Sequence, residues 1–394
     1  TLCAYVASPF RFCLCCGVSY DFRQRTDYGK VSSVGVGGRS SATTILALSS
    51  IRTLKSDDIY LPQKARKLLS FTDNRQDASL QAGHFNDFIE IGILRAALYK
   101  AAKDSAEKGI AHDELTQKIF NALNLPLDLY SSDPGVKFQA KINTDRAFRN
   151  VLGYRIYRDL KRGWRVTSPN LEQCGLIEIK YGSLLELCGE DQEWEALHPA
   201  LKTASSETRY KIAKVLLDYM RRELAINVNY LDPNFQEQLQ QQNNQFLSGQ
   251  LALDEDERTE HARILFPRSQ RKGDFRGSMF LSPRSGYGQF LGRINTFPDY
   301  PEKLKVGDKE QIIRELLNAL KIAGIVKEVM KTKDKDDVSG FQLAASALFW
   351  TAGDGTQPFH DEIRVPTLPE GGGRTNRFFV DFYQYIAGEL IGVE

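Results

Sequence analysis

A short apolar run followed by a polar turn is the feature of this sequence that most limits its fold. Residues 67–71 (KLLSF) lead at once into residues 72–78 (TDNRQDA), and a stretch with helical periodicity continues to about Ala101. A strand, a tight turn and the N-terminus of a helix account for this order. The sequence therefore predicts an α/β fold in which this corner positions the first long helix.

This corner resembles motif IV of the superfamily 2 helicases, at the start of their second RecA-like domain. Its continuation, residues 79–88 (SLQAGHFNDF), is similar to one branch of them, the large prokaryotic DEAD/DEAH-type DNA helicases related to repair helicases with a C-terminal cysteine-rich module. The resemblance implies a partial RecA-like parallel sheet, DNA as partner, and ATP-dependent movement in DNA repair or in defence against foreign DNA. It also implies that the motifs carrying the arginine finger lie beyond Glu394.

The polar residues of the corner suit contacts to a phosphate backbone. A turn before a helix presents free N–H groups and the positive end of the helix dipole to an anion. Thr72 and Asn74 can add hydrogen bonds, Arg75 can add a charge-assisted one, and Asp73 is expected to cap the helix. The alternative is an ordinary turn whose polar side chains satisfy only the backbone. The predicted nucleic-acid-binding set here is Thr72, Asn74, Arg75 and Gln76.

The motifs that would hold ATP do not occur in this sequence. A helicase needs GxxxxGK[ST] around the phosphates and a DExH or DEAD box for Mg²⁺, and neither is present. The acidic run at residues 254–257 follows a glutamine-rich stretch and is interpreted as solvated charge. The chain begins at Thr1 and ends in what reads as a starting strand. We therefore expect an interior piece of a longer protein, inactive alone, with ATP and Mg²⁺ sites elsewhere in the parent.

The pattern along the chain predicts α/β structure plus a mostly α part, divided into five segments. Helices are expected at residues 40–54 and 376–390, and residues 236–257 are expected to form a mobile, exposed stretch because they are Gln/Asn-rich and then acidic. The segments are a Cys/Gly-rich knuckle or linker (1–38), the start of a second RecA-like domain (39–101), a helical insertion (102–307), a winged-helix-like unit (308–365) and a return to the RecA-like domain (366–394).

The winged-helix prediction comes from the order of elements after Asp308. Asp308 can cap a helix that runs to Gly324, a strand follows at residues 325–329, and a charged turn leads to two further strands at 340–343 and 347–350. A helix, a strand, a polar turn and a strand form the closing half of a winged helix. Such units bind duplex DNA, but many are protein-packing modules. The sequence leaves both alternatives open.

A basic stretch with interleaved aromatic residues is the second predicted nucleic-acid surface. Residues 263–293 hold seven basic residues against a single acidic one, Asp274, together with five aromatic residues and five glycines. Arginines can contact phosphates and aromatic rings can stack on unpaired bases. A solvated loop edge with a few anchoring aromatics is the alternative. The residues assigned to DNA here are Arg268, Arg271, Lys272, Arg276, Arg284 and Arg293.

Cysteine usage points to a possible metal site and to a reducing compartment. Four of the six cysteines fall within the first sixteen residues, which is no disulfide framework for a chain of 394 residues. Cys13 and Cys16 have the spacing of a zinc knuckle, but zinc needs four ligands, so a partial or empty knuckle is the alternative to a zinc site. Cys174 and Cys188 are isolated in apolar surroundings and are expected in the core.

The overall composition is that of a globular protein, and it excludes a protein whose whole surface is strongly basic or acidic. Lys plus Arg (52) nearly balance Asp plus Glu (50), so any nucleic-acid surface must be local. No apolar stretch approaches a membrane-spanning length, and no secretion signal opens the chain, so the cytoplasm is the expected location. Expected partners are DNA, the remainder of the helicase chain and accessory proteins. The competing hypothesis is a non-catalytic protein-interaction module built on the winged helix.

Overall fold

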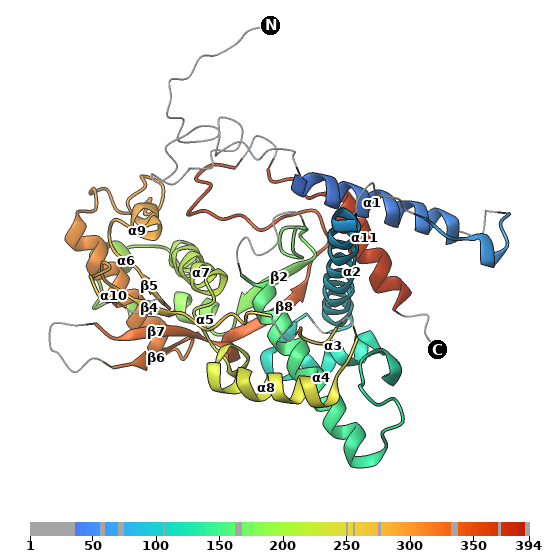
Figure 1. Ribbon diagram of the computed structural model, residues 1–394. Helices are drawn as coiled ribbons and strands as arrows, with labels where there is room; N and C mark the ends of the chain where they lie inside the picture. The colour runs from blue at the N-terminus through green and yellow to red at the C-terminus, as the bar shows by residue number, and fades with distance from the viewer. Residues whose placement is uncertain are drawn as a thin grey trace, which may run out of the picture.

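The helices and strands of the chain are seen in a computed structural model (Figure 1). It describes residues 36–55, 60–69, 75–105, 107–161, 168–249, 251–254, 257–274, 277–331, 338–368 and 372–390, with the side chains of 36–42, 75–81 and 84 left out. The fold is α/β with many helices and two sheets, which confirms the coarse prediction. No helix in the described ranges is long and apolar enough to cross a membrane.

Three helices near the two ends of the described chain pack together. They are α1 (Val36–Lys55), α2 (Arg75–Lys103) and α11 (Arg377–Glu389), and they confirm the predicted helices at 40–54, from 75 onward, and at 376–390. Figure 1 shows α11 beside α2, with Phe88 of α2 centred 5.3 Å from the ring of Phe382. Arg52 of α1 lies 3.9 Å from the centroid of the Tyr385 ring. Segments almost 300 residues apart in sequence are thereby joined.

The strand predicted at residues 67–71 is wrong over its described part. Residues 66–69 follow a short 3-10 helix (Gln63–Ala65) and are irregular, with Leu68 41% and Leu69 77% exposed. A strand is stabilised by pairing with neighbours, and no described strand pairs with these residues. Residues 70–74 lie outside the described ranges. The parallel sheet expected around this corner is therefore not formed by the residues that the structure describes.

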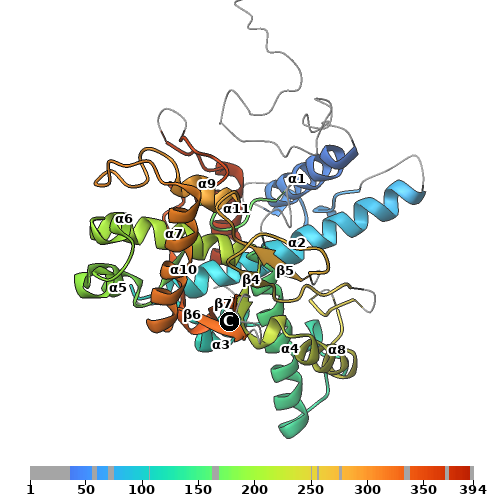
Figure 2. The same ribbon diagram turned by 90° about the vertical axis from the view of Figure 1, so that its left-hand side faces the viewer.

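The predicted helical insertion contains seven helices among its described residues. Packing of α3 and α4 buries an aromatic cluster in which the rings of Tyr130 and Phe148 stack at 4.5 Å. Figure 2 shows α5, α6 and α7 gathered on one side, away from α2. The seven helices are α3 (His112–Leu123), α4 (Phe138–Asp159), α5 (Leu184–Gly189), α6 (Pro199–Lys202), α7 (Ser206–Arg222), α8 (Pro233–Phe246) and α9 (Gly286–Leu291).

The first sheet has three antiparallel strands in the order β1–β8–β2. Its strands are β1 (Ile110–Ala111), β8 (Leu348–Ala352) and β2 (Ile177–Tyr181). The central residue Trp350 pairs with Ile110 on one side and Ile179 on the other, and it is fully buried. Residues more than 200 positions apart thus share one sheet, which the sequence patterns alone did not predict.

The second sheet is mixed and is organised around β7. Strand β7 pairs in parallel with β3, and in an antiparallel sense with β4 and β6, while β4 and β5 are parallel. All five residues of β7 are buried. The strands are β3 (Ile226–Asn227), β4 (Ile264–Phe266), β5 (Ser278–Phe280), β6 (Val326–Met330) and β7 (Gly340–Ala344).

The helix and hairpin predicted after Asp308 are present as α10 (Val306–Ile322), β6 and β7. Asp308 is not the N-cap: its carboxylate accepts the N–H of Lys305, 2.7 Å away, from the third position of the helix. The third predicted strand, β8, belongs to the other sheet. Most buried apolar residues of this unit belong to the same core cluster as Phe88 and Trp350. The predicted domain boundaries therefore stay predictions.

The prediction that residues 236–257 form a mobile, exposed stretch is wrong for their described part. The first part of the stretch lies in α8, whose N-cap Asp232 accepts the N–H of Phe235. The buried amide of Asn243 accepts the N–H of Leu253 at 2.7 Å and donates to its carbonyl at 2.9 Å. Glu257 of the acidic run forms an ion pair with Arg158. Amide side chains are stable in a core when the backbone satisfies both of their ends, which composition cannot reveal.

Candidate functional site

The residues of the motif IV resemblance fall partly outside the described ranges. Thr72 and Asn74 lie there, and Arg75 and Gln76 open helix α2, with side chains that the structure does not describe. The helix does begin where the polar turn predicts. Its first N–H groups have no partner within the helix, and the positive end of its dipole therefore adjoins the residues of the motif. The role of these four residues in binding DNA stays a prediction.

Arg268 of the predicted basic surface is used inside the protein. Its guanidinium donates two hydrogen bonds to Asp274, at 2.7 and 2.9 Å, and lies 5.3 Å from the ring centroid of Phe266 and 5.0 Å from that of Phe280. The hydrogen bond from Arg268 and the backbone N–H of Arg271 lower the pKa of Asp274 to about 2. Arg268 therefore stabilises the turn after β4 through Asp274, and its predicted contact with a phosphate stays a prediction.

Arg293 and the aromatic residues of this stretch are also structural. The Arg293 guanidinium donates to the carbonyl oxygens of Glu362 and Ile363, and burial lowers its pKa. Tyr287 and Phe290, assigned to base stacking, are buried in the core, where the Tyr287 hydroxyl donates to the carbonyl of Ile212 at 3.0 Å. The alternative of anchoring aromatics at a loop edge describes these residues better than base stacking does.

Three basic residues of the stretch remain exposed in the described ranges. They are Arg271 and Lys272, in the turn held by Asp274, and Arg284 before α9. Arg276 lies outside the described ranges. The structure thus divides the six predicted residues into two that stabilise the fold, three at the surface and one that it does not describe.

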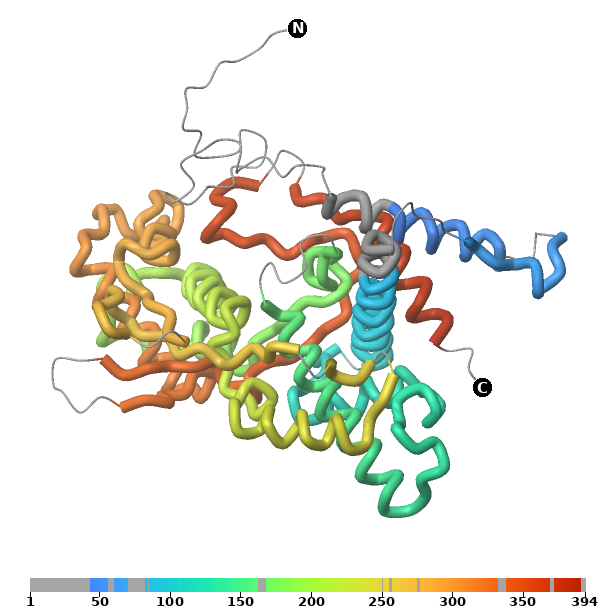
Figure 3. The backbone as a smooth tube through the Cα atoms, in the orientation of Figure 1, coloured from blue at the N-terminus to red at the C-terminus, as the bar shows by residue number. Residues whose placement is uncertain are grey.

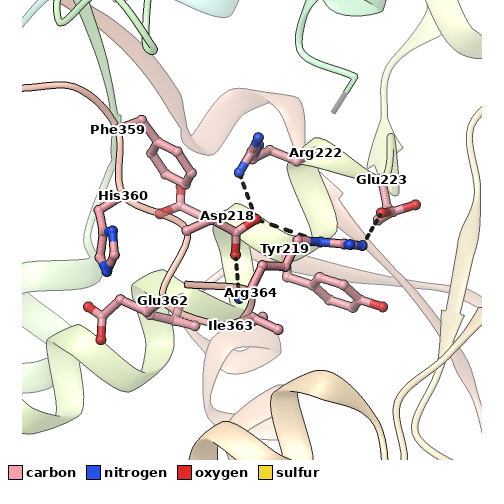
Figure 4. A pocket seen from close by; sticks show the side chains of 11 residues that line it. Asp218, Tyr219, Arg222, Glu223, Phe359, His360, Glu362, Ile363 and Arg364 are labelled. Atoms are coloured by element: carbon pink, nitrogen blue, oxygen red, sulfur yellow. Dashed lines mark hydrogen bonds and ion pairs between the residues drawn. The ribbon is translucent and has the colours of Figure 1, made fainter. Parts of the chain in front are cut away.

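A charged cleft between α7 and the loop after β8 was not predicted from the sequence. It has a volume of about 480 Å³ and is lined by α7, by β2 and by residues 353–362. Figure 4 shows the loop facing the helix next to this cleft. Arg222 pairs with Asp361 at 3.0 Å and stacks 4.5 Å from the centroid of the Phe359 ring, and Lys211 pairs with Glu362 at 3.0 Å. These cations are matched to carboxylates of the loop.

A buried ion network lies beneath the cleft. Arg221 is fully buried and donates to both oxygens of Glu172, at 2.6 and 2.8 Å, and to Asp218 at 2.9 Å. Tyr181 donates to Asp218 at 2.7 Å. Burial alone would raise the pKa of Asp218, but Arg221 and Lys214 outweigh it and hold that pKa below its usual value. Among the described residues the charges of this network are paired with one another, so they are not available to an anion, and removing one partner would leave a buried charge uncompensated.

The cysteines proposed as metal ligands lie outside the described residues. These are Cys13 and Cys16, and the described part of the chain contains no cluster of three or more His, Cys, Asp or Glu side chains placed to hold an ion. The zinc knuckle therefore stays a prediction. Cys174 and Cys188 are free and buried, as expected from the sequence.

We expect Cys174 and Cys188 to resist alkylation in the folded protein. Burial raises the pKa of each thiol to about 12, and the thiolate is the nucleophile. Iodoacetamide at pH 8 followed by peptide mass spectrometry should leave both unmodified, and both should react fully in concentrated urea. Rapid modification of either one without denaturant would contradict the buried positions.

In the comparisons with known proteins, no family model, no curated protein and no solved structure matches this chain.

Proposed function

We propose that this chain is an interior part of an ATP-dependent DNA helicase or translocase and contributes to its grip on DNA. In this proposal α1, α2 and α11 belong to the second RecA-like lobe, and the segment between α2 and α11 is an insertion that ends in a winged-helix-like unit. ATP and Mg²⁺ bind in other parts of the parent chain, so the fragment alone is expected to lack ATPase activity. Accessory proteins and the rest of the chain are its other expected partners.

The observation that carries the proposal is the packing of α2 against α11. Helix α2 starts within the residues that resemble motif IV, at Arg75, and α11 follows the whole intervening segment. Their contacts include Phe88 with Phe379 and Phe382, and Gly92, where an added Cβ would come within 3.0 Å of the Phe382 ring. An insertion leaves and re-enters its host domain at one place, because the host must still close its own core. Figure 3 shows in red the described residues between β8 and α11 and the helix α11 itself.

The set of DNA-contacting residues in this proposal is smaller than the set predicted from the sequence. Arg271, Lys272 and Arg284 are the described cations of the predicted set that remain at the surface, and Arg276 is added from the sequence. The proposed contacts to the phosphate backbone of DNA also include Thr72, Asn74, Arg75 and Gln76. Arg268 and Arg293 are left out because their Nη groups already donate within the protein, those of Arg268 to Asp274 and those of Arg293 to the carbonyls of Glu362 and Ile363.

Salt-dependent DNA binding tests the proposal. Binding of a fluorescent single strand and a duplex should weaken steeply as salt rises. Replacing Arg271, Lys272 and Arg276 with alanine should make the logarithmic salt slope shallower by about 2 to 3, because each lost phosphate contact changes it by about 0.7 to 0.9. A matched triple variant, Lys141→Ala, Lys202→Ala and Lys303→Ala, changes three lysines elsewhere on the surface and should leave the slope near that of the unmodified chain.

The absence of DNA binding at low salt would contradict this function and favour the protein-interaction module. That second candidate is favoured by the internal use of Arg268 and Arg293 and by the burial of Tyr287 and Phe290. An unchanged salt slope in the triple variant would remove the basic stretch from the interface. It would leave the motif IV residues as the remaining proposed contacts.

A further inference from the structure

A second cavity lies at the first sheet, at its boundary with the end of α10. It has a volume of about 440 Å³, which is within the usual range of ligand pockets, about 300 to 1,000 Å³. The sheet contributes side chains of β2 and β8, and Ala323–Ile325 close the opposite wall. Unlike the lysine and arginine of α7, two lysines that line this cavity form no ion pair with a residue in the described ranges. The lining residues that matter here are Lys108, Lys180, Gly182, Ser183, Gly324 and Phe349.

Phe349 is the aromatic element of the cavity wall. It is half-buried on β8, and its cross-strand partners are Lys180 of β2 and Ala111 of β1. Its ring rests on Gly182, where an added Cβ would lie 2.8 Å from a ring carbon. Gly182 is fixed by a 2.8 Å hydrogen bond from its N–H to the carbonyl of Ala347. The ring therefore packs closely on the backbone of Gly182, and Phe349 also lines the cavity.

Two lysines flank this ring without an anionic partner among the described residues. The Nζ atom of Lys108 lies over the ring of Phe349, 5.8 Å from its centroid, and Lys180 is directly across the strand pair from Phe349. Both are exposed, and neither forms an ion pair with any residue in the described part of the chain. Glu107 and Glu186 also line the cavity and balance the two positive charges. With two lysines and two glutamates, the lining is not basic enough to bind a run of phosphates. One aromatic ring between two lysines suits a single base with one phosphate on each side.

We propose that this cavity holds one nucleotide of single-stranded DNA, with the base against Phe349 and the flanking phosphates on Lys108 and Lys180. Stacking on an aromatic ring with nearby cations is the sequence-tolerant mode of single-strand binding. Glu107, Glu186 and the Ser183 hydroxyl can accept hydrogen bonds from amino groups of the base. The inference rests on the proposed function, for which it supplies a contact to the unpaired strand.

The test uses the chain of residues 1–394 and an oligothymidine that carries 2-aminopurine at its centre. Stacking quenches 2-aminopurine fluorescence, so binding should dim the probe. Phe349→Leu keeps an apolar side chain and the fold, and it should weaken binding on the order of tenfold and restore the fluorescence. Its matched control is Phe138→Leu, which changes an aromatic residue that is 87% exposed in α4 and should have no effect. Lys108→Gln with Lys180→Gln should make the salt slope shallower by about 1.4.

The outcomes separate this inference from the function on which it rests. Unchanged affinity and quenching in Phe349→Leu, with a slope that still depends on Arg271, Lys272 and Arg276, would overturn the cavity assignment and leave the proposed function standing. No binding of either strand form would contradict both. Binding of free dAMP as tight as that of the oligonucleotide would overturn the assignment to a strand. Circular dichroism of each variant checks that the fold is kept.

Discussion

Replacing Arg221 with alanine is expected to lower the free energy of unfolding by about 3 to 5 kcal/mol. The side chain is fully buried and is bonded to Glu172, Asp218 and Tyr181, so its removal leaves two buried carboxylates without their main cation. The loss should be visible in urea denaturation as a lower midpoint. The substitution should also raise the pKa of Asp218, because the charge of Arg221 contributes most to lowering that pKa.

Arg314→Ala is the matched control for this prediction. Arg314 forms an ion pair with Glu310 at 2.7 Å in α10, but its side chain is 52% exposed. Exposed pairs four residues apart on a helix contribute about 0.3 to 0.5 kcal/mol, so this variant should unfold nearly as the unmodified chain does. An equally small loss in Arg221→Ala would contradict the prediction. It would mean that water reaches the network, although Arg221 is fully buried in the structure.

Replacing Arg95 with alanine should lower the free energy of unfolding by a similar amount, about 3 to 5 kcal/mol. Arg95 of α2 pairs with Asp159 of α4 through two hydrogen bonds, at 2.6 and 2.9 Å. It also donates to the carbonyls of Ser168 and Pro169 and, at 2.8 Å, to the hydroxyl of Tyr383 in α11. One side chain therefore connects both flanking helices to the intervening segment.

Hydrogen exchange distinguishes this connecting role from a general loss of stability. In Arg95→Ala the amides of α11, which contains the Arg95 partner Tyr383, should exchange faster than those of α10. Arg377→Ala, an exposed arginine at the start of α11, is the matched control and should stay within about 0.5 kcal/mol of the unmodified chain. Equal acceleration in α10 and α11 would argue against a local connection.

Helical periodicity predicted the helices well, because each is encoded by residues close together in sequence. The apolar spacing before Gly324 gave α10, and that glycine has the positive φ of 73° expected just after a helix. The aromatic spacing after Asn376 gave α11, whose Phe379, Phe382 and Tyr383 are buried. The polar residues after Phe71 correctly marked the start of α2.

Strand pairing was predicted poorly, because it depends on partners far away along the chain. Nothing local in residues 177–181 indicates that they pair with residues 348–352, and the apolar run at 67–69 lacks a described partner altogether. Charge patterns failed for a related reason. A count of basic residues treats Arg268 as free, whereas the single acidic residue of the stretch, Asp274, lies at the right place to bind it.

The candidate sites show the same division between local and distant information. Phe349, Lys108 and Lys180 are separated by up to 241 positions, so no motif links them before the first sheet assembles. The cleft beside α7 likewise needs a helix and a loop that are distant in sequence. One signal was available: the run at residues 360–362 places two acidic residues in a loop, and both bind cations of α7.

The short connection between the two sheets limits how this protein can be divided into folded fragments. Strand β7 ends at Ala344 and β8 starts at Leu348, with one 3-10 turn (Ala345–Ala347) between them. A recombinant piece containing residues 308–365 alone would separate β7 from β3 and β4, and β8 from β1 and β2. Truncation boundaries placed on either side of this unit would therefore yield aggregation-prone polypeptides with unpaired strand edges rather than an isolated module.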